Sequence, residues 1–231
     1  GATEAINLAI KGIFEHYSGE KQHYISCKTE HKAVLDTLDH LQSKGAEVTY
    51  LPVNQFGEID LEELNSSILP HTKMISLMWA NNETGLIHQM DRIKEIAEER
   101  NIILFTDAVQ AVGKIPLDIK GIHLMAISAH KMYGPKGIGA IYIRHNRPLP
   151  KPLALIDGGG HEKGFRSGTL NVPGIVGFGM AAELRSKNQI VEASRLENLR
   201  NLLESRILEI EGTSVNGNLQ NRLSHVTNLS F

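Results

Sequence analysis

The stretch Ser128-Ala129-His130-Lys131-Met132-Tyr133-Gly134-Pro135-Lys136-Gly137 follows directly on an apolar, strand-like segment at 124–128. A second apolar run, residues 102–106, ends in the same way, in Asp107-Ala108-Val109-Gln110. Short apolar runs bounded by turn residues are typical of buried strands, and α/β proteins bind their ligands outside the carboxyl ends of such strands. The two strand ends therefore predict one ligand site that carries an amine, an imidazole, a hydroxyl and a carboxylate.

Lys131 and Asp107 are the two residue types that the chemistry of pyridoxal 5'-phosphate (PLP) requires. A lysine amine forms a Schiff base with the cofactor aldehyde, and a carboxylate keeps the ring nitrogen protonated so that the ring accepts electrons. Each residue alone has a simpler explanation, as a solvated loop lysine or as a helix cap. The Ser-x-His-Lys cluster at a strand end, and glycines at 134, 137 and 139 that let the backbone pass close to a bulky group, favour the PLP hypothesis.

Composition sets broad limits on the function. The chain has 231 residues, 41% of them hydrophobic, and a net charge of −2, which gives no sign of a nucleic-acid or anionic-membrane partner. No apolar run approaches the roughly 20 residues of a membrane span. The single cysteine, Cys27, excludes an internal disulfide framework and fits a reducing compartment. The histidines form no metal-binding spacing, so we expect no metal site.

Strand-like and helix-like segments alternate along the chain, which predicts an α/β domain with a mostly parallel sheet and helices on both faces. The expected helices cover residues 4–17, 31–43, 60–68, 91–100 and 174–210. The expected strands cover residues 23–26, 47–53, 73–80, 102–107, 124–128, 139–144 and 226–231.

Two domains are expected. The alternation of strand-like and helix-like segments weakens after Arg144. Residues 145–152 carry three prolines, and a glycine-rich loop and a long polar helix follow them. We assign residues 1–170 to a large ligand-binding domain and 171–231 to a connecting helix with the start of a smaller α+β domain. Both ends of the chain fall inside expected elements, so we interpret it as an internal fragment.

Six separated motifs resemble those of cysteine desulfurases of the IscS/NifS type, PLP enzymes of fold type I in the class V aminotransferase family. They are Gly1-Ala2-Thr3-Glu4, Thr29-Glu30-His31-Lys32, Asn81-Asn82-Glu83-Thr84-Gly85, Asp107-Ala108-Val109-Gln110, Ser128-Ala129-His130-Lys131 with Gly134-Pro135-Lys136-Gly137, and Gly158-Gly159-Gly160-His161-Glu162 leading to Arg166-Ser167-Gly168-Thr169. One match is weak, but six in the family's order and approximate spacing are specific.

The resemblance implies a role for each candidate residue. Lys131 would hold PLP and move protons at the substrate, His31 would lie against the ring as an acid–base group, and Asp107 would pair with the ring nitrogen. The other implied cofactor contacts are Asn82 and Gln110 at the ring oxygen, and Ala2, Thr3, Ser128, Ala129, His130 and Thr169 at the phosphate. Ala2 and Thr3 open the first expected helix, whose amino end favours an anion. Thr169 would reach the phosphate of a partner subunit, which implies a homodimer with shared sites.

The resemblance also implies a reaction. The protein would remove sulfur from L-cysteine, giving L-alanine and an enzyme-bound persulfide, and pass the sulfur to a scaffold or acceptor protein for iron–sulfur clusters or tRNA thiolation. A cytoplasmic location, or an organellar matrix, is expected. A selenocysteine lyase, another class V PLP aminotransferase and a non-catalytic remnant remain alternatives.

Two departures from the family pattern bear on the site. Ala129 stands where the family usually has glycine, beside the expected phosphate. The family's nucleophilic cysteine lies on a loop in the C-terminal part, and this chain does not contain it; Cys27 is expected to be a buried structural residue instead. We therefore expect the 231-residue piece alone to be inactive.

Overall fold

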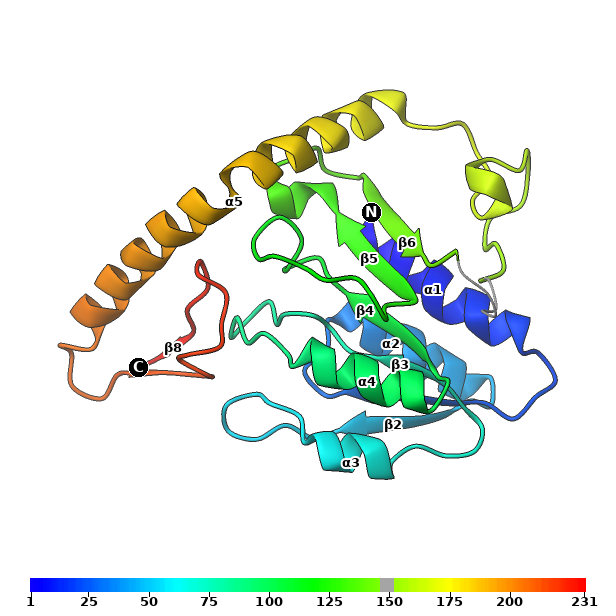
Figure 1. Ribbon diagram of the computed structural model, residues 1–231, viewed down its shortest axis with the longest axis horizontal. Coiled ribbons are helices and arrows are strands. Elements are labelled where there is room, and N and C mark those ends of the chain that lie inside the picture. The colour runs from blue at the N-terminus through cyan, green and yellow to red at the C-terminus, as the bar shows by residue number, and fades with distance from the viewer. Residues whose placement is uncertain (146–151) are drawn as a thin grey trace.

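A six-stranded sheet forms the centre of the molecule, with strand order β2-β1-β3-β4-β5-β6 (Figure 1). The computed structural model describes residues 1–145 and 152–231, so most of the proline-containing segment noted above lies outside the described residues. Strands β1 to β5 run parallel, and β6 pairs antiparallel with β5. The strands are β1 (His23–Cys27), β2 (Glu47–Leu51), β3 (Thr72–Ser76), β4 (Ile103–Asp107), β5 (Leu124–Ser128) and β6 (Gly139–Ile143).

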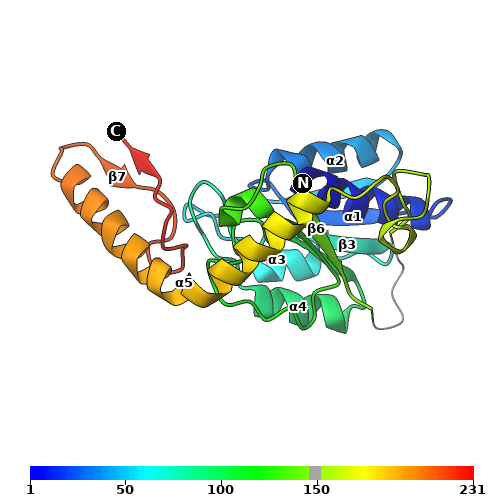
Figure 2. The ribbon, with the colours of Figure 1, turned by 90° about the horizontal axis from the view of Figure 1, so that it is seen from above.

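Helices cover both faces of this sheet (Figure 2). Helices α1 (Ala2–His16) and α2 (Lys32–Ser43) lie on one face, and α3 (Leu61–Ser66) and α4 (Met90–Glu99) lie on the other. Helix α3 begins at Asp60, whose side chain accepts a hydrogen bond from the Glu62 amide at 2.8 Å. The arrangement confirms the α/β class and the largely parallel sheet that the sequence predicts.

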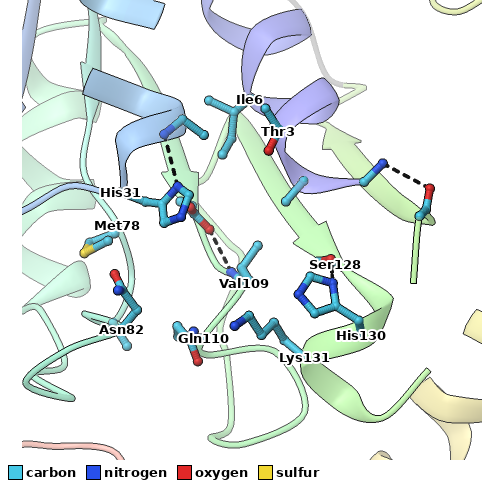
Figure 3. A pocket seen from close by; sticks show the side chains of 16 residues that line it. Thr3, Ile6, His31, Met78, Asn82, Val109, Gln110, Ser128, His130 and Lys131 are labelled. Carbon is cyan, nitrogen blue, oxygen red and sulfur yellow. Dashed lines mark hydrogen bonds between the residues drawn. The ribbon is translucent and has the colours of Figure 1, made fainter. Parts of the chain in front are cut away.

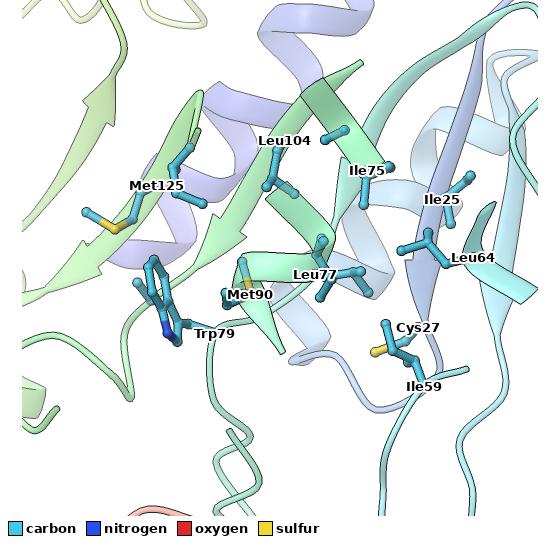
Figure 4. Packing of buried hydrophobic residues seen from close by; sticks show 14 of the residues in the cluster. Ile25, Cys27, Ile59, Leu64, Ile75, Leu77, Trp79, Met90, Leu104 and Met125 are labelled. Atoms are coloured by element: carbon cyan, nitrogen blue, oxygen red, sulfur yellow. The ribbon is translucent and has the colours of Figure 1, made fainter. Parts of the chain in front are cut away.

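Side chains along each central strand point alternately to the two faces of the sheet, which explains why both faces of the sheet are apolar. Tyr24, Met74 and Phe105 pack under α1 and α2, whereas their neighbours Ile25, Ile75 and Leu104 pack in the second cluster, on the α3 and α4 side (Figure 4). Successive side chains of a strand point to opposite faces, so a strand covered on both sides is apolar throughout. Strands β1 and β4 are buried at every position.

Helix α5 (Val172–Ile207) leaves the sheet beside the turn that carries Lys131 (Figure 1). Helix α5 and this turn are in close contact. A side chain at Gly177 of α5 would meet Pro135 of the turn, and one at Gly134 of the turn would meet Ala181 of α5. Beyond α5, the two-residue strands β7 (Ser214–Val215) and β8 (Leu229–Ser230) pair antiparallel. The assignment of residues 171–231 to a separate domain stays a prediction.

Most element boundaries lie within a few residues of those expected from the sequence. Two strands are shorter than predicted by more than two residues. The expected strand 73–80 ends its ladder at Ser76, although the amides of Leu77 and Trp79 still donate to β4 carbonyls. The expected strand 226–231 contains only Leu229–Ser230 because its partner β7 offers just two residues.

Candidate active site

One cavity of about 320 Å³ opens at the carboxyl ends of the parallel strands, beside the first turn of α1 (Figure 3). Polar groups of five segments converge there, as expected where adjacent parallel strands end. The lining residues are Gly1, Ala2, Thr3, Ile6, His31, Ala33, Met78, Ala80, Asn82, Asp107, Val109, Gln110, Ser128, His130, Lys131 and Gly137. Nine of the eleven residues that the sequence predicts at a PLP site line this cavity, and the exceptions are Ala129 and Thr169.

Lys131 enters the cavity from a short 3-10 helix, Ala129–Met132, which directly follows β5. Tyr133 ends this turn in the left-handed conformation, with φ of 66°. Few non-glycine residues adopt that conformation, and here it reverses the chain immediately after Met132. Figure 3 shows the Lys131 side chain extended from this turn toward Gln110 and Val109.

Asp107 is the last residue of β4 and is 7% exposed. One carboxylate oxygen accepts a hydrogen bond from the Val109 amide at 2.9 Å. Burial raises the pKa of this carboxyl, although the Val109 bond and the nearby His31 act in the opposite direction. A cationic group bound at this end of the cavity would therefore favour the charged form of Asp107.

His31 is held by its own helix. It is the N-cap of α2, and its Nδ1 accepts a hydrogen bond from the Ala33 amide at 3.0 Å (Figure 3). Because Nδ1 is the acceptor, the neutral ring carries its proton on Nε2. The cap thus decides which nitrogen of His31 is free to act in the cavity.

Glu30, next to His31, is a buried carboxyl group that the sequence reasoning did not single out. Its Oε1 accepts the Met78 amide and lies 3.8 Å from the Cys27 sulfur, while Oε2 has no hydrogen-bond partner within residues 1–145 and 152–231. Burial raises the pKa of Glu30 well above its usual range. An unpaired buried oxygen is best tolerated when the group is neutral, so we assign Glu30 as protonated.

Replacing Glu30 with glutamine is therefore expected to stabilise the folded protein at pH 8 and to change it little at pH 4.5. The unfolded carboxyl ionises near pH 4.5, so wild-type stability falls as pH rises from there toward the folded pKa, by at most about 1.4 kcal/mol per unit. Urea denaturation of both proteins across this range measures the difference. A difference that does not depend on pH would show that Glu30 is ionised in the folded state.

The opposite end of the cavity suits an anion. Ala2 and Thr3 of the first turn of α1 line it, and the α1 N-cap, Gly1, offers no side chain to accept hydrogen bonds from the first-turn amides. Ser128 Oγ and His130 Nδ1 lie 2.8 Å apart beside them. Burial and the nearby Lys131 ammonium lower the pKa of His130, as expected where the local potential is positive.

Asn82 and Gln110 face the cavity between these two ends (Figure 3). Asn82 lies in a tight turn that Asn81 organises, since the Asn81 side-chain oxygen accepts the Glu83 and Thr84 amides, each at 2.9 Å. Gln110 follows Asp107 by three residues. Both amides can donate to an acceptor oxygen of a bound ring.

Ala129 and Thr169 do not line the cavity. The Ala129 amide donates to the Ile138 carbonyl at 3.2 Å and its methyl group is fully buried, so it has no free donor for a phosphate. Thr169 is exposed on the loop after Arg166, whose Nε donates to Glu4 of α1 at 2.8 Å. That ion pair holds the loop beside the amino end of α1. The structure thus leaves Thr169 accessible at the surface.

The sequence reasoning also missed several apolar lining residues, among them Met78, Ala80 and Val109. No chemical signal marks them, because an apolar residue after a buried strand predicts core as readily as site. Among the described residues no helix is long and apolar enough to cross a membrane. The same part of the chain contains no group of three or more His, Cys, Asp and Glu residues that could hold a metal ion.

Comparison with known proteins agrees with this geometry. The whole chain, residues 1–231, matches the aminotransferase class-V family. It is 47% identical over 234 residues to the cysteine desulfurase IscS of Anaeromyxobacter dehalogenans; the match covers 100% of this chain and 58% of that protein. Among solved structures, a NifS-like protein matches with a TM-score of 0.94 at 39% identity, and SspA in complex with cysteine with a TM-score of 0.87 at 36% identity. These two matches cover all of this chain and 63% and 64% of the solved chains.

Proposed function

Because the chain belongs to the class-V aminotransferase family, we propose that it forms the cofactor-binding part of a PLP-dependent cysteine desulfurase. The family uses PLP. The proposed protein removes sulfur from L-cysteine, leaves L-alanine and keeps the sulfur as a persulfide. The observation that carries the proposal is a single cavity into which Lys131, Asp107, His31 and the amino end of α1 all open.

The described residues fit PLP at both ends of the cofactor. Asp107 keeps one carboxylate oxygen without a hydrogen-bond partner in the described parts of the chain, and this oxygen suits a protonated ring nitrogen. The uncapped first turn of α1, Thr3, Ser128 and His130 suit the phosphate. When bound, PLP supplies a ring that accepts electrons from the α-carbon of the substrate.

Lys131 and His31 supply the proton transfers in this proposal. Lys131 would hold the cofactor through Nζ, and its amine would remove the proton from the substrate α-carbon. His31 acts through Nε2, because its Nδ1 is engaged by α2. Asp107 keeps the ring nitrogen protonated, and a positive charge there offsets the burial that otherwise favours a neutral carboxyl.

Sulfur transfer needs a thiolate that these 231 residues do not supply. In the proposed step the thiolate attacks the substrate sulfur and forms an S–S bond while the Cβ–Sγ bond breaks. The electron pair of the broken bond stays with Cβ, which takes up a proton and becomes the methyl group of L-alanine. Cys27 is the only cysteine here, is fully buried, and has a pKa raised by burial to about 12. The nucleophile is therefore assigned to a part of the protein outside these residues.

Replacing Cys27 with alanine in the full-length protein is expected to leave alanine release from L-cysteine unchanged. Loss of a buried sulfur should cost about 1–2 kcal/mol of stability, in the range of small core deletions. Initial rates and the denaturation midpoint measure the two effects. A variant with normal stability and no turnover would refute the structural role of Cys27.

Alanine release by the full-length protein, supplied with PLP and L-cysteine, tests the proposed function directly. Formation of alanine together with a protein-bound persulfide is the expected result. Parallel assays with L-selenocysteine and with an amino donor plus a 2-oxo acid separate the alternatives. Amino transfer without alanine formation from L-cysteine would overturn the desulfurase assignment in favour of an aminotransferase.

Partners and location are proposed on the same basis. Exposed Thr169, on the loop that the Arg166–Glu4 pair anchors, is proposed to reach the phosphate of a second subunit in a homodimer. The persulfide sulfur is proposed to pass to an iron–sulfur scaffold or another acceptor protein. Thiolate chemistry of this kind favours a reducing compartment, either the cytoplasm or an organellar matrix.

A further inference from the structure

Lys114 does not line the cavity but contacts Gln110, which does. Its Nζ donates a hydrogen bond to Oε1 of Gln110 at 2.7 Å. The two residues are four positions apart in the turn that follows Asp107, and hydrogen bonds from Val112 to Ala108 and from Ile115 to Ala111 wind this turn like a helix. Positions four apart meet on one side of such a turn.

This bond fixes the orientation of the Gln110 amide. An ammonium group can only donate, so the end of the amide that it holds must be the oxygen. The NH₂ end is then free on the other side. Figure 3 shows the side-chain oxygen of Gln110 pointing away from His31 and Val109. The amide therefore presents a donor, not an acceptor, to the cavity.

Lys114 is half-buried, and it differs from the buried lysine Lys94 in its partners. Lys94 is 7% exposed and pairs with Asp91 at 2.7 Å and Asp118 at 3.8 Å. Lys114 forms no ion pair within residues 1–145 and 152–231, and burial, with Lys131 and Arg185 nearby, lowers its pKa to about 8. Arg185, itself 8% exposed, donates to the adjacent Gly113 carbonyl. Because burying a cation without a carboxylate partner costs free energy, an ion pair does not explain the position of Lys114.

We propose that Lys114 is a positioning residue that orients Gln110, so that the NH₂ group of Gln110 would donate a hydrogen bond to the oxygen on the cofactor ring. This orientation favours the form of the cofactor in which the ring oxygen accepts a hydrogen bond. This role rests on the proposed function, because Gln110 meets a ring oxygen only if PLP occupies the cavity. Lys114 itself does not line the cavity. It acts through Gln110, and loss of either residue removes the same contact.

Equilibrium dialysis of PLP against the apo form of the full-length protein tests the assignment. Lys114→Met and Gln110→Ala are each expected to raise the PLP dissociation constant about tenfold, the value of one good hydrogen bond. The absorption band of the bound cofactor should change in the same way in both variants. Lys114→Arg, which keeps a donor, should restore wild-type affinity and spectrum. The matched control Lys94→Met should lower the denaturation midpoint and leave both cofactor readouts unchanged.

The double variant distinguishes positioning from independent binding. If Lys114 acts through Gln110, adding Lys114→Met to Gln110→Ala changes the dissociation constant by less than about twofold. Independent, multiplicative effects would overturn the proposal, as would an unchanged dissociation constant in Lys114→Met. Wild-type protein that takes up no PLP would instead refute the proposed function itself, and this role with it.

Discussion

Replacing Lys131 with alanine is expected to abolish covalent attachment of PLP to the full-length protein. Lys131 is the lysine that opens into the cavity, at the end of β5 and opposite His31 and Asp107. Only an amine can form the Schiff base with the cofactor aldehyde. Borohydride reduction followed by peptide mapping should label Lys131 in the wild type and no residue in the variant.

Lys136 provides the matched control for this experiment. It is exposed and lies in the same turn, five residues beyond Lys131, but does not line the cavity. Lys136→Ala should keep the full yield of the reduced adduct. A label on Lys136 in the wild-type protein, or an adduct that persists in Lys131→Ala, would refute the assignment of Lys131.

Replacing Asp107 with asparagine is expected to slow proton exchange at the α-carbon of L-cysteine by at least about 100-fold, a barrier change of roughly 2.7 kcal/mol. Asparagine keeps the shape and can still accept the Val109 amide bond. It cannot supply the negative charge that holds a proton on the ring nitrogen. Exchange measured by loss of the α-deuterium signal isolates this step from sulfur transfer.

The same substitution is expected to stabilise the apo protein, which separates the catalytic effect from damage to the fold. Burial raises the pKa of Asp107 in the folded, empty site above its pKa in the unfolded chain. The stability that this group contributes is therefore fully present below the unfolded pKa and is lost as the pH rises through the folded pKa. At pH 8, Asp107→Asn should therefore raise the apo denaturation midpoint, while Asp36→Asn, at an exposed position of α2, should change neither quantity. Near-normal exchange in Asp107→Asn would exclude the proposed role.

Most of the fold can be predicted because short apolar strands alternate with amphipathic helices. Strand β5 has the predicted boundaries, and Asp60, where the helix 60–68 is predicted to begin, is the N-cap of α3. The end of β3 and the C-terminal region were less predictable. The two-residue pairing of β7 with β8 depends on how the chain after α5 folds back, and no local pattern encodes it.

The sequence motifs predict which residues belong to the candidate site, but they do not predict how these residues are arranged in space. Lys131, Asp107 and His31 come from three separate motifs, and the structure places all three around one cavity. Ala129 belongs to the same motif as Lys131 yet turns its amide to Ile138. Adjacent residues in a tight turn point in different directions, so a motif names candidates without deciding which of them face the ligand.

The sequence by itself determined the fold class, the family resemblance and the residue types that a PLP site needs, because these follow from periodicity and from chemical identity. Only the tertiary structure decided the states of those residues. The tautomer of His31 depends on its cap of α2, the raised pKa of Glu30 on burial, and the orientation of Gln110 on Lys114. The physical reason is that protonation and hydrogen-bond direction are set by burial and by the geometry of the surrounding groups, and both exist only once the chain has folded.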